Sequence, residues 1–177
     1  MRFSAMRGFT LIEMMISVAV LIVLVAIVAP SFNHFFDKYR VKRAADTLSS
    51  FLINAKSEAI KRNKSVSMVI TGTGATWCAG MTENATCNCT TANACQIDAQ
   101  DRVIASTAFK GVKLLGPTTT ATTPHVFEFK TNRGTVTGSA TVNFESADGL
   151  KLDVVVGQFG RIRLCSPSGS IGEYPSC

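Results

Sequence analysis

Residues 1–29 read MRFSAMRGFTLIEMMISVAVLIVLVAIVA, a short basic leader followed by an apolar run whose only charge is Glu13. At about 1.5 Å per residue, a helix over residues 9–29 extends roughly 31 Å, enough to cross the hydrocarbon core of a bilayer. The small residues of the kind that end a secretory signal lie inside this run, whereas Gly8 stands directly in front of it. A cut after Gly8 leaves the hydrophobic helix on the mature chain, so the sequence predicts a transmembrane helix at residues 9–29.

Glu13 is the anomaly of this run. A carboxylate inside a spanning helix costs roughly 2.5–3.5 kcal/mol on insertion scales, so Glu13 requires a partner, and the nearest natural partner is a free amine. The plainer alternative is a signal anchor in which the positive end of the helix dipole stabilises the carboxylate.

The junction resembles the class III signal of type IV pilins. Gly8 ends the leader, Phe9 begins the mature chain in the order GFTLIE, Glu13 is its fifth residue and Pro30 its twenty-second. The resemblance implies cleavage after Gly8 by a prepilin peptidase and N-methylation of Phe9. It also implies that Glu13 pairs with the amine of Phe9 in a neighbouring subunit. The expected partners are therefore other pilin subunits, the prepilin peptidase and the inner membrane.

Six cysteines in the downstream part of the chain indicate an oxidising compartment. They are Cys78, Cys87, Cys89, Cys95, Cys165 and Cys177. Their density and even number favour disulfides, so we expect the head to be periplasmic, and extracellular once it reaches the pilus on the cell surface. A bridge between Cys87 and Cys89 would be strained by its spacing. If Cys165 pairs with Cys177, a bridge worth about 3 kcal/mol, two patterns remain open: 78–87 with 89–95, or 78–89 with 87–95.

Residues suited to catalysis or metal binding are scarce. The Cys-rich segment lacks the C-x2–4-C knuckles of tetrahedral zinc sites, so we expect no metal. The two histidines, His34 and His125, lie in no nucleophile or metal motif. A glycine-rich phosphate loop is also missing from the sequence. We therefore expect a non-enzyme without cofactors.

The pattern changes from helical to strand-like along the chain. After Pro30, apolar residues recur at intervals of three and four as far as residue 60, which predicts an amphipathic helix. Short apolar segments separated by Gly, Asn, Thr and Pro clusters follow. We predict strands at 65–70, 75–81, 102–105, 111–115, 125–130, 140–145, 150–156 and 160–165. The predicted parts are a leader (1–8), a transmembrane or filament-core helix (9–29), an amphipathic helix (30–63) and a β-rich head (64–177).

The later strands resemble those of the GspH/FimT/FimU family of minor pilins. The resemblance rests on PHVFEFKTNRGTV, ATVNF and LKLDVVVGQFGRIRLC, and it does not cover the Cys-rich segment within residues 72–124. It implies an α+β type IV pilin fold, in which one long N-terminal helix, kinked at Pro30, packs on a β-sheet head. It also implies a minor subunit of a type IV pilus.

The segment Gly160-Arg161-Ile162-Arg163 is the feature that distinguishes this head from that of a generic minor pilin, although the motif is short. In a strand, Arg161 and Arg163 would project together while Ile162 turns inward. This G-R-x-R resembles the motif of FimT-type pilins, which bind DNA in natural transformation. The resemblance implies double-stranded DNA as a partner, bound by Arg161 and Arg163. We expect help from Lys151 and from the hydroxyls and backbone N–H groups of residues 166–170.

Three functions remain open on sequence alone. They are a DNA-binding minor pilin for DNA uptake, a pilus-priming or tip subunit of the FimU type without DNA binding, and a type II secretion pseudopilin. Residues 65–177 carry eight basic and eight acidic side chains, so anion binding requires local clustering. Two arginines on a strand are also commonly a solvated outer face, which is the plain alternative to a DNA site.

Overall fold

The computed structural model describes residues 9–117, 123–131, 133–167, 169 and 171–177, with only the backbone of residues 28–31 and 33. The chain forms two compact units, Met1–Phe36 and Asp37–Cys177, which are described separately. One helix, α1 (Leu11–Arg62), contributes to both. The helix continues through residue 30. Because the side chains of residues 28–31 are not described, the kink at Pro30 stays a prediction.

The N-terminal unit is a helix whose apolar side chains face outward. Every described large apolar side chain from Leu11 to Ile27 is at least 49% exposed. Within the described residues, however, no helix combines the length and the apolar character needed to cross a membrane. The side chains of residues 28 and 29 are not described, and the membrane span at residues 9–29 stays a prediction.

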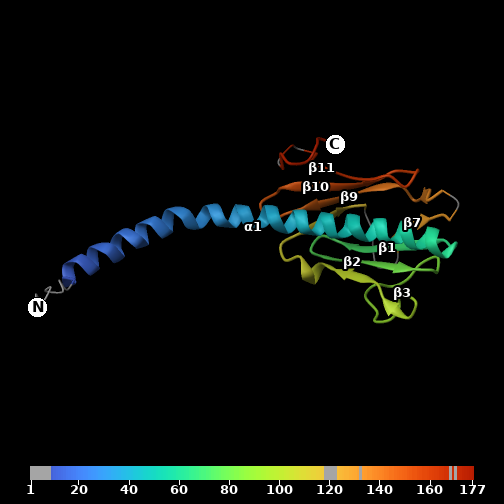
Figure 1. Ribbon diagram of the computed structural model, residues 1–177, viewed down its shortest axis with the longest axis horizontal. Helices are drawn as coiled ribbons and strands as arrows, with labels where there is room; N and C mark the ends of the chain where they lie inside the picture. The colour runs from blue at the N-terminus through green and yellow to red at the C-terminus, as the bar shows by residue number, and fades with distance from the viewer. Residues whose placement is uncertain (1–8, 118–122, 132, 168, 170) are drawn as a thin grey trace, which may run out of the picture. The chain divides into compact units, whose positions relative to one another are not determined.

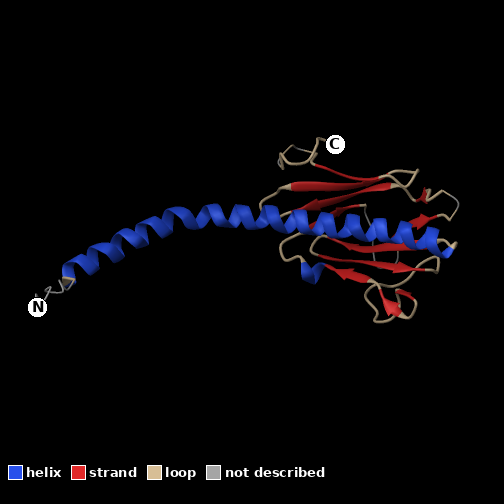
Figure 2. Ribbon diagram, in the orientation of Figure 1, coloured by secondary structure: helices blue, strands red, loops and turns tan. Residues whose placement is uncertain are grey.

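The described residues of the head form eleven strands, which pair antiparallel. Figure 1 shows how the strands are arranged in sheets. They are β1 (Val66–Thr73), β2 (Thr76–Thr82), β3 (Gln96–Ile97), β4 (Gln100–Asp101), β5 (Val103–Ala105), β6 (Lys113–Gly116), β7 (His125–Phe129), β8 (Val136–Thr137), β9 (Ala140–Glu145), β10 (Lys151–Val156) and β11 (Ile162–Cys165). A short 3-10 helix, η1 (Ser106–Ala108), follows β5. One sheet has the order β5-β2-β1-β7-β8, a second has the order β11-β10-β9-β6, and β3 pairs with β4. Helix and strands together confirm the α+β class (Figure 2).

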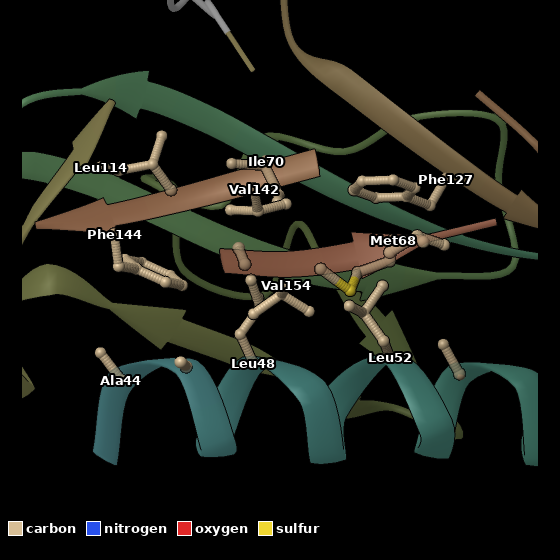
Figure 3. Close-up of a cluster of buried hydrophobic side chains, with 14 of the residues drawn as sticks. Ala44, Leu48, Leu52, Met68, Ile70, Leu114, Phe127, Val142, Phe144 and Val154 are labelled. Carbon is tan, nitrogen blue, oxygen red and sulfur yellow. The ribbon is translucent and has the colours of Figure 1, made fainter. Parts of the chain in front are cut away.

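One stripe of α1 supplies the helical side of the core. The stripe consists of fully or almost fully buried small and aliphatic residues at intervals of three and four. They are Val41, Ala44, Ala45, Leu48, Leu52, Ala55 and Ala59. Figure 3 shows Leu48 and Leu52 pointing toward Met68 of β1 and Val154 of β10, so the stripe packs against both large sheets. Alanine on this face lets the helix lie close to the strands.

Two of the three disulfides involve the Cys-rich segment: the first joins it to β2 of the first sheet, and the second closes a loop within it. They join Cys78 to Cys89 and Cys87 to Cys95, with Cα–Cα distances of 5.9 and 5.3 Å. This is the second of the two patterns left open by the sequence. Arg62, in the last turn of α1, forms ion pairs with Glu58, Glu83 and Asp98, and so ties the same segment to the helix.

The C-terminal loop is closed by the third disulfide and fastened to α1. Cys165 and Cys177 are joined with a Cα–Cα distance of 5.0 Å. Glu173 forms ion pairs with Lys38, at 2.8 Å, and with Lys42. These two ammonium groups lower the pKa of Glu173 to about 2. The loop is therefore held at both ends, by a covalent bond to β11 and by charge to the helix.

Asp153 is a buried carboxylate at the centre of the second sheet. It is 5% exposed, and its Oδ1 has no hydrogen-bond partner among the described residues. Its Oδ2 lies 3.9 Å from Sγ of Cys177. Burial raises the pKa of Asp153, and a hydrogen bond from Asn143 offsets this only in part. A carboxyl group that binds its proton more tightly in the folded chain lowers stability as pH rises through that range.

We predict that Asp153→Asn stabilises the head at neutral pH. The amide removes a buried charge, so the melting temperature at pH 7 should rise by a few degrees, equivalent to roughly 1 kcal/mol. The gain should vanish below about pH 4, where the carboxyl group is protonated in both folded and unfolded chains. Thermal melts at several pH values measure this. A variant that is less stable than wild type at pH 7 contradicts the prediction, and Asp148→Asn at an exposed turn is the control.

Candidate nucleic-acid interface

The predicted N-terminal processing site, Gly8 and Phe9, precedes α1 in the sequence. Gly8 is outside the described residues, Phe9 is 81% exposed, and Glu13 is exposed in the first turn of the helix. The backbone N–H of Glu13 donates to Oγ1 of Thr10, at 3.3 Å, which is an N-cap hydrogen bond. Glu13 thus occupies a position where the helix N-terminus favours a negative charge. Its pairing with the amine of Phe9 in another subunit stays a prediction.

The arginine motif lies in the hairpin between β10 and β11, which we call the arginine hairpin, residues 155–164. Its turn is closed by backbone hydrogen bonds from Gly157 N–H to the Arg161 carbonyl and from Gly160 N–H to the Gly157 carbonyl, both at 2.9 Å. The N–H of Val136, in β8, donates to the Gln158 carbonyl at 2.8 Å. The turn is therefore fixed by its own bonds and by the neighbouring sheet.

Gly160 is a second point at which this turn contacts the rest of the head. Its φ is +69°, and a Cβ at this position would lie 2.0 Å from the carbonyl oxygen of Gly134. Lys56 of α1 donates from Nζ to the Gly160 carbonyl at 3.0 Å. The helix, the turn after β7 and the arginine hairpin thus meet at one point, where any side chain at residue 160 would prevent the contact.

We predict that Gly160→Ala destabilises the head by more than about 2 kcal/mol. The substitution adds the cost of a left-handed backbone, roughly 1–2 kcal/mol, to the collision with the Gly134 carbonyl. Chemical denaturation of wild type and variant measures the difference. The matched control is Gly74→Ala, which has a φ of +67° but open space around the added Cβ. Equal losses for the two variants would mean that the contact with Gly134 contributes nothing.

The structure places Arg161 and Arg163 side by side on the outer surface. Arg163 lies in β11 opposite Val155, and Arg161 precedes the strand rather than lying within it, because β11 begins at Ile162. Both arginines are exposed, while Ile162 and Leu164 are half-buried and pack on the core. Within the described part of the chain, neither guanidinium has an ion-pair partner. Together with Val155, Gly157 and Phe159 they line an open pocket of about 220 Å³.

The structure does not bring Lys151 to the arginines. It lies at the other end of β10, opposite Glu145, about 13 Å along the strand from Val155. Asp153 and Cys165 form the pair that lies between them. The prediction for the 166–170 loop is also wrong at Ser166, which is fully buried and hydrogen-bonds the Lys151 carbonyl, at 3.2 Å. Ser168 and Ser170 lie outside the described residues.

Three residues near the arginines were missed by the sequence analysis. Phe159 lines their pocket, Lys56 holds their turn, and Arg133 is exposed immediately before Gly134. Lys130, in the same turn as Arg133, is paired with Glu128 at 2.7 Å, and this contact lowers the pKa of Glu128. The sequence does indicate that Phe159 is exposed, because an aromatic residue between turn-forming glycines has no neighbouring strand residue to pack against.

Comparison with known families agrees with this architecture. A family described as type II transport protein GspH matches residues 44–172, more than half of the chain, and the prokaryotic N-terminal methylation motif matches residues 4–29. No curated protein and no solved structure matches the chain. The methylation motif implies prepilin peptidase processing and a processed pilin in the membrane and the pilus. The chain belongs to the GspH family of type IV pilin-like proteins.

Proposed function

We propose that this chain is a minor pilin whose head binds DNA without sequence preference and serves DNA uptake in natural transformation. The family makes it a subunit of a pilus or of a secretion pseudopilus. The observation that supports DNA binding is the exposed pair Arg161 and Arg163, which lies on a hairpin held by contacts with Lys56 and Gly134. Each guanidinium group presents several donors in a planar fork that matches phosphate oxygens, so less side-chain freedom is lost for each hydrogen bond formed.

Charge distribution limits the strength of the proposed binding. Residues 65–177 have as many acidic as basic side chains, so the net charge of this part of the head gives no general attraction for polyanions. A site of two to four phosphate contacts gives weak binding, no better than micromolar for a single head. Several heads on one filament would raise the overall affinity through avidity without any further contact.

The second candidate is a subunit without DNA binding, either a pilus-priming pilin or a type II secretion pseudopilin. It is favoured by the description of the matched family as a transport protein. In that case the arginines would be a solvated outer face of the head. The affinity of the chain for duplex DNA separates the two candidates.

The same proposal assigns no catalytic activity to the chain. All six cysteines form disulfides, so no thiolate is available as a nucleophile or metal ligand. The exposed surfaces described above suit binding to polymers and to other subunits rather than the enclosure of a small substrate.

For assembly, we propose that Glu13 pairs with the methylated amine of Phe9 in a neighbouring subunit. Glu13→Ala removes the carboxylate but leaves Gly8 and Phe9 intact. We therefore expect normal cleavage of the leader and a strong loss of the subunit from sheared filaments, measured by immunoblot in a deletion strain. Normal incorporation would contradict the pairing role.

Gly8→Glu is the complementary variant for the processing step. A bulky charged side chain at the last leader residue should block the peptidase, so the chain should keep its leader and run as the larger precursor on a gel. Continued processing of this variant would contradict the assignment of Gly8 as the cleavage site.

For DNA binding, we expect the full chain in detergent micelles to bind duplex DNA at low salt. With two to four phosphate contacts, the slope of log K against log salt should lie near −2 to −4. The double variant Arg161→Gln with Arg163→Gln should lose most of the affinity and flatten the slope. Its stability should change by no more than about 0.5 kcal/mol, because both side chains are exposed. Fluorescence anisotropy of labelled duplex measures affinity and slope.

The control for this experiment is Lys110→Gln with Lys113→Gln, which removes two exposed positive charges elsewhere on the head. It should bind nearly as well as wild type. If wild type gives no binding at low salt, or if the arginine variant binds as well as wild type, the DNA function is wrong and the second candidate replaces it.

A further inference from the structure

Phe159 is exposed in a way that the fold does not require. At 83%, it is the most exposed large apolar side chain among the described residues, and it belongs to the head rather than to the N-terminal helix. Leaving a phenylalanine in water forgoes most of the stabilisation that burying its side chain would give. A polar residue would occupy this turn position at no such cost, so the ring requires an explanation outside the folded head.

The surroundings of Phe159 point to the chemistry of its ligand. The ring lines the same open pocket as Arg161 and Arg163. The turn that carries it is closed by the Gly160–Gly157 hydrogen bond and held by Lys56. An aromatic face beside cations is the combination by which proteins hold single-stranded nucleic acids, because bases stack on the ring while phosphates contact the cations.

We propose that Phe159 is a stacking platform for an unpaired base, so that the arginine hairpin prefers single-stranded DNA to blunt duplex. This inference rests on the proposed DNA function and specifies its substrate class. In duplex DNA the base faces are already stacked on one another, and only the phosphates are available to Arg161 and Arg163. In a single strand a base can leave its neighbours and lie on the ring of Phe159 while the flanking phosphates contact both arginines.

The test compares three DNA ligands with the full chain in detergent micelles. They are an oligo(dT) strand, an abasic strand of equal length, and a blunt duplex. Wild type should bind oligo(dT) more tightly than the abasic strand, which offers phosphates without bases. Phe159→Ala should weaken oligo(dT) binding by roughly tenfold. It should leave the abasic strand, the duplex and the salt slope almost unchanged, because the phosphate contacts remain.

Phe159→Trp gives a direct readout of stacking and serves as the conservative variant. It should restore the affinity for oligo(dT), and its fluorescence should be quenched by oligo(dT) but not by the abasic strand. The native Trp77 is 3% exposed and lies in the core, so wild type measured in parallel supplies the background signal.

The outcomes separate this inference from the proposed function. If Phe159→Ala binds oligo(dT) as well as wild type while the arginine double variant does not, the DNA function stands and the stacking role is wrong. If wild type binds none of the three ligands, both are wrong. If Phe159→Ala changes only incorporation into filaments, the ring contacts another pilin subunit and the stacking role is again wrong.

Discussion

The burial of one stripe of α1 between the two large sheets is the constraint from which the rest of the head follows. Ala44, Leu48 and Leu52 occupy the side of the helix that faces the core, and each is at most 1% exposed. With that face fixed, the other faces are directed toward loops. Lys42 reaches the C-terminal loop, Lys56 reaches the arginine hairpin, and Arg62 reaches the Cys-rich segment, so a single packing arrangement positions all three.

Much of this architecture can be predicted from the sequence, because the helical spacing of apolar residues and the apolar–polar alternation of strands depend on local residues. Every predicted strand corresponds to an observed one, and the helix continues to Arg62 as its apolar spacing indicates. The short strands β3, β4 and β8 were missed because strands of two residues carry no alternation. The choice between two disulfide patterns was also beyond the sequence, since it depends on how the Cys-rich segment folds back onto β2.

For the candidate site, the sequence predicts which residues share a face but not which lie together. Arg161 and Arg163 are neighbours on one strand end, so their exposure follows from alternation. Lys151 lies on the same face of the sheet, but on the neighbouring strand β10 and at the far end of that strand. Only the register of β10 with β9 and β11 reveals this separation. The approach of Lys56 and Gly134 to Gly160 joins residues far apart in sequence, and no local pattern records it.

Ion pairing explains how residues 65–177, which carry as many acidic as basic side chains, present a basic site. Lys38 and Lys42 of α1 are paired with Glu173, Lys130 with Glu128, and Arg62 of α1 with three carboxylates. Five carboxylates are therefore engaged at the places where the fold is held together. Within the described residues, Arg161 and Arg163 are left without such a carboxylate, so their charge is available to a ligand. The net charge counts the paired and the unpaired cations together. Only the positions of the ion pairs distinguish a cation that stabilises the fold from one that can bind a phosphate.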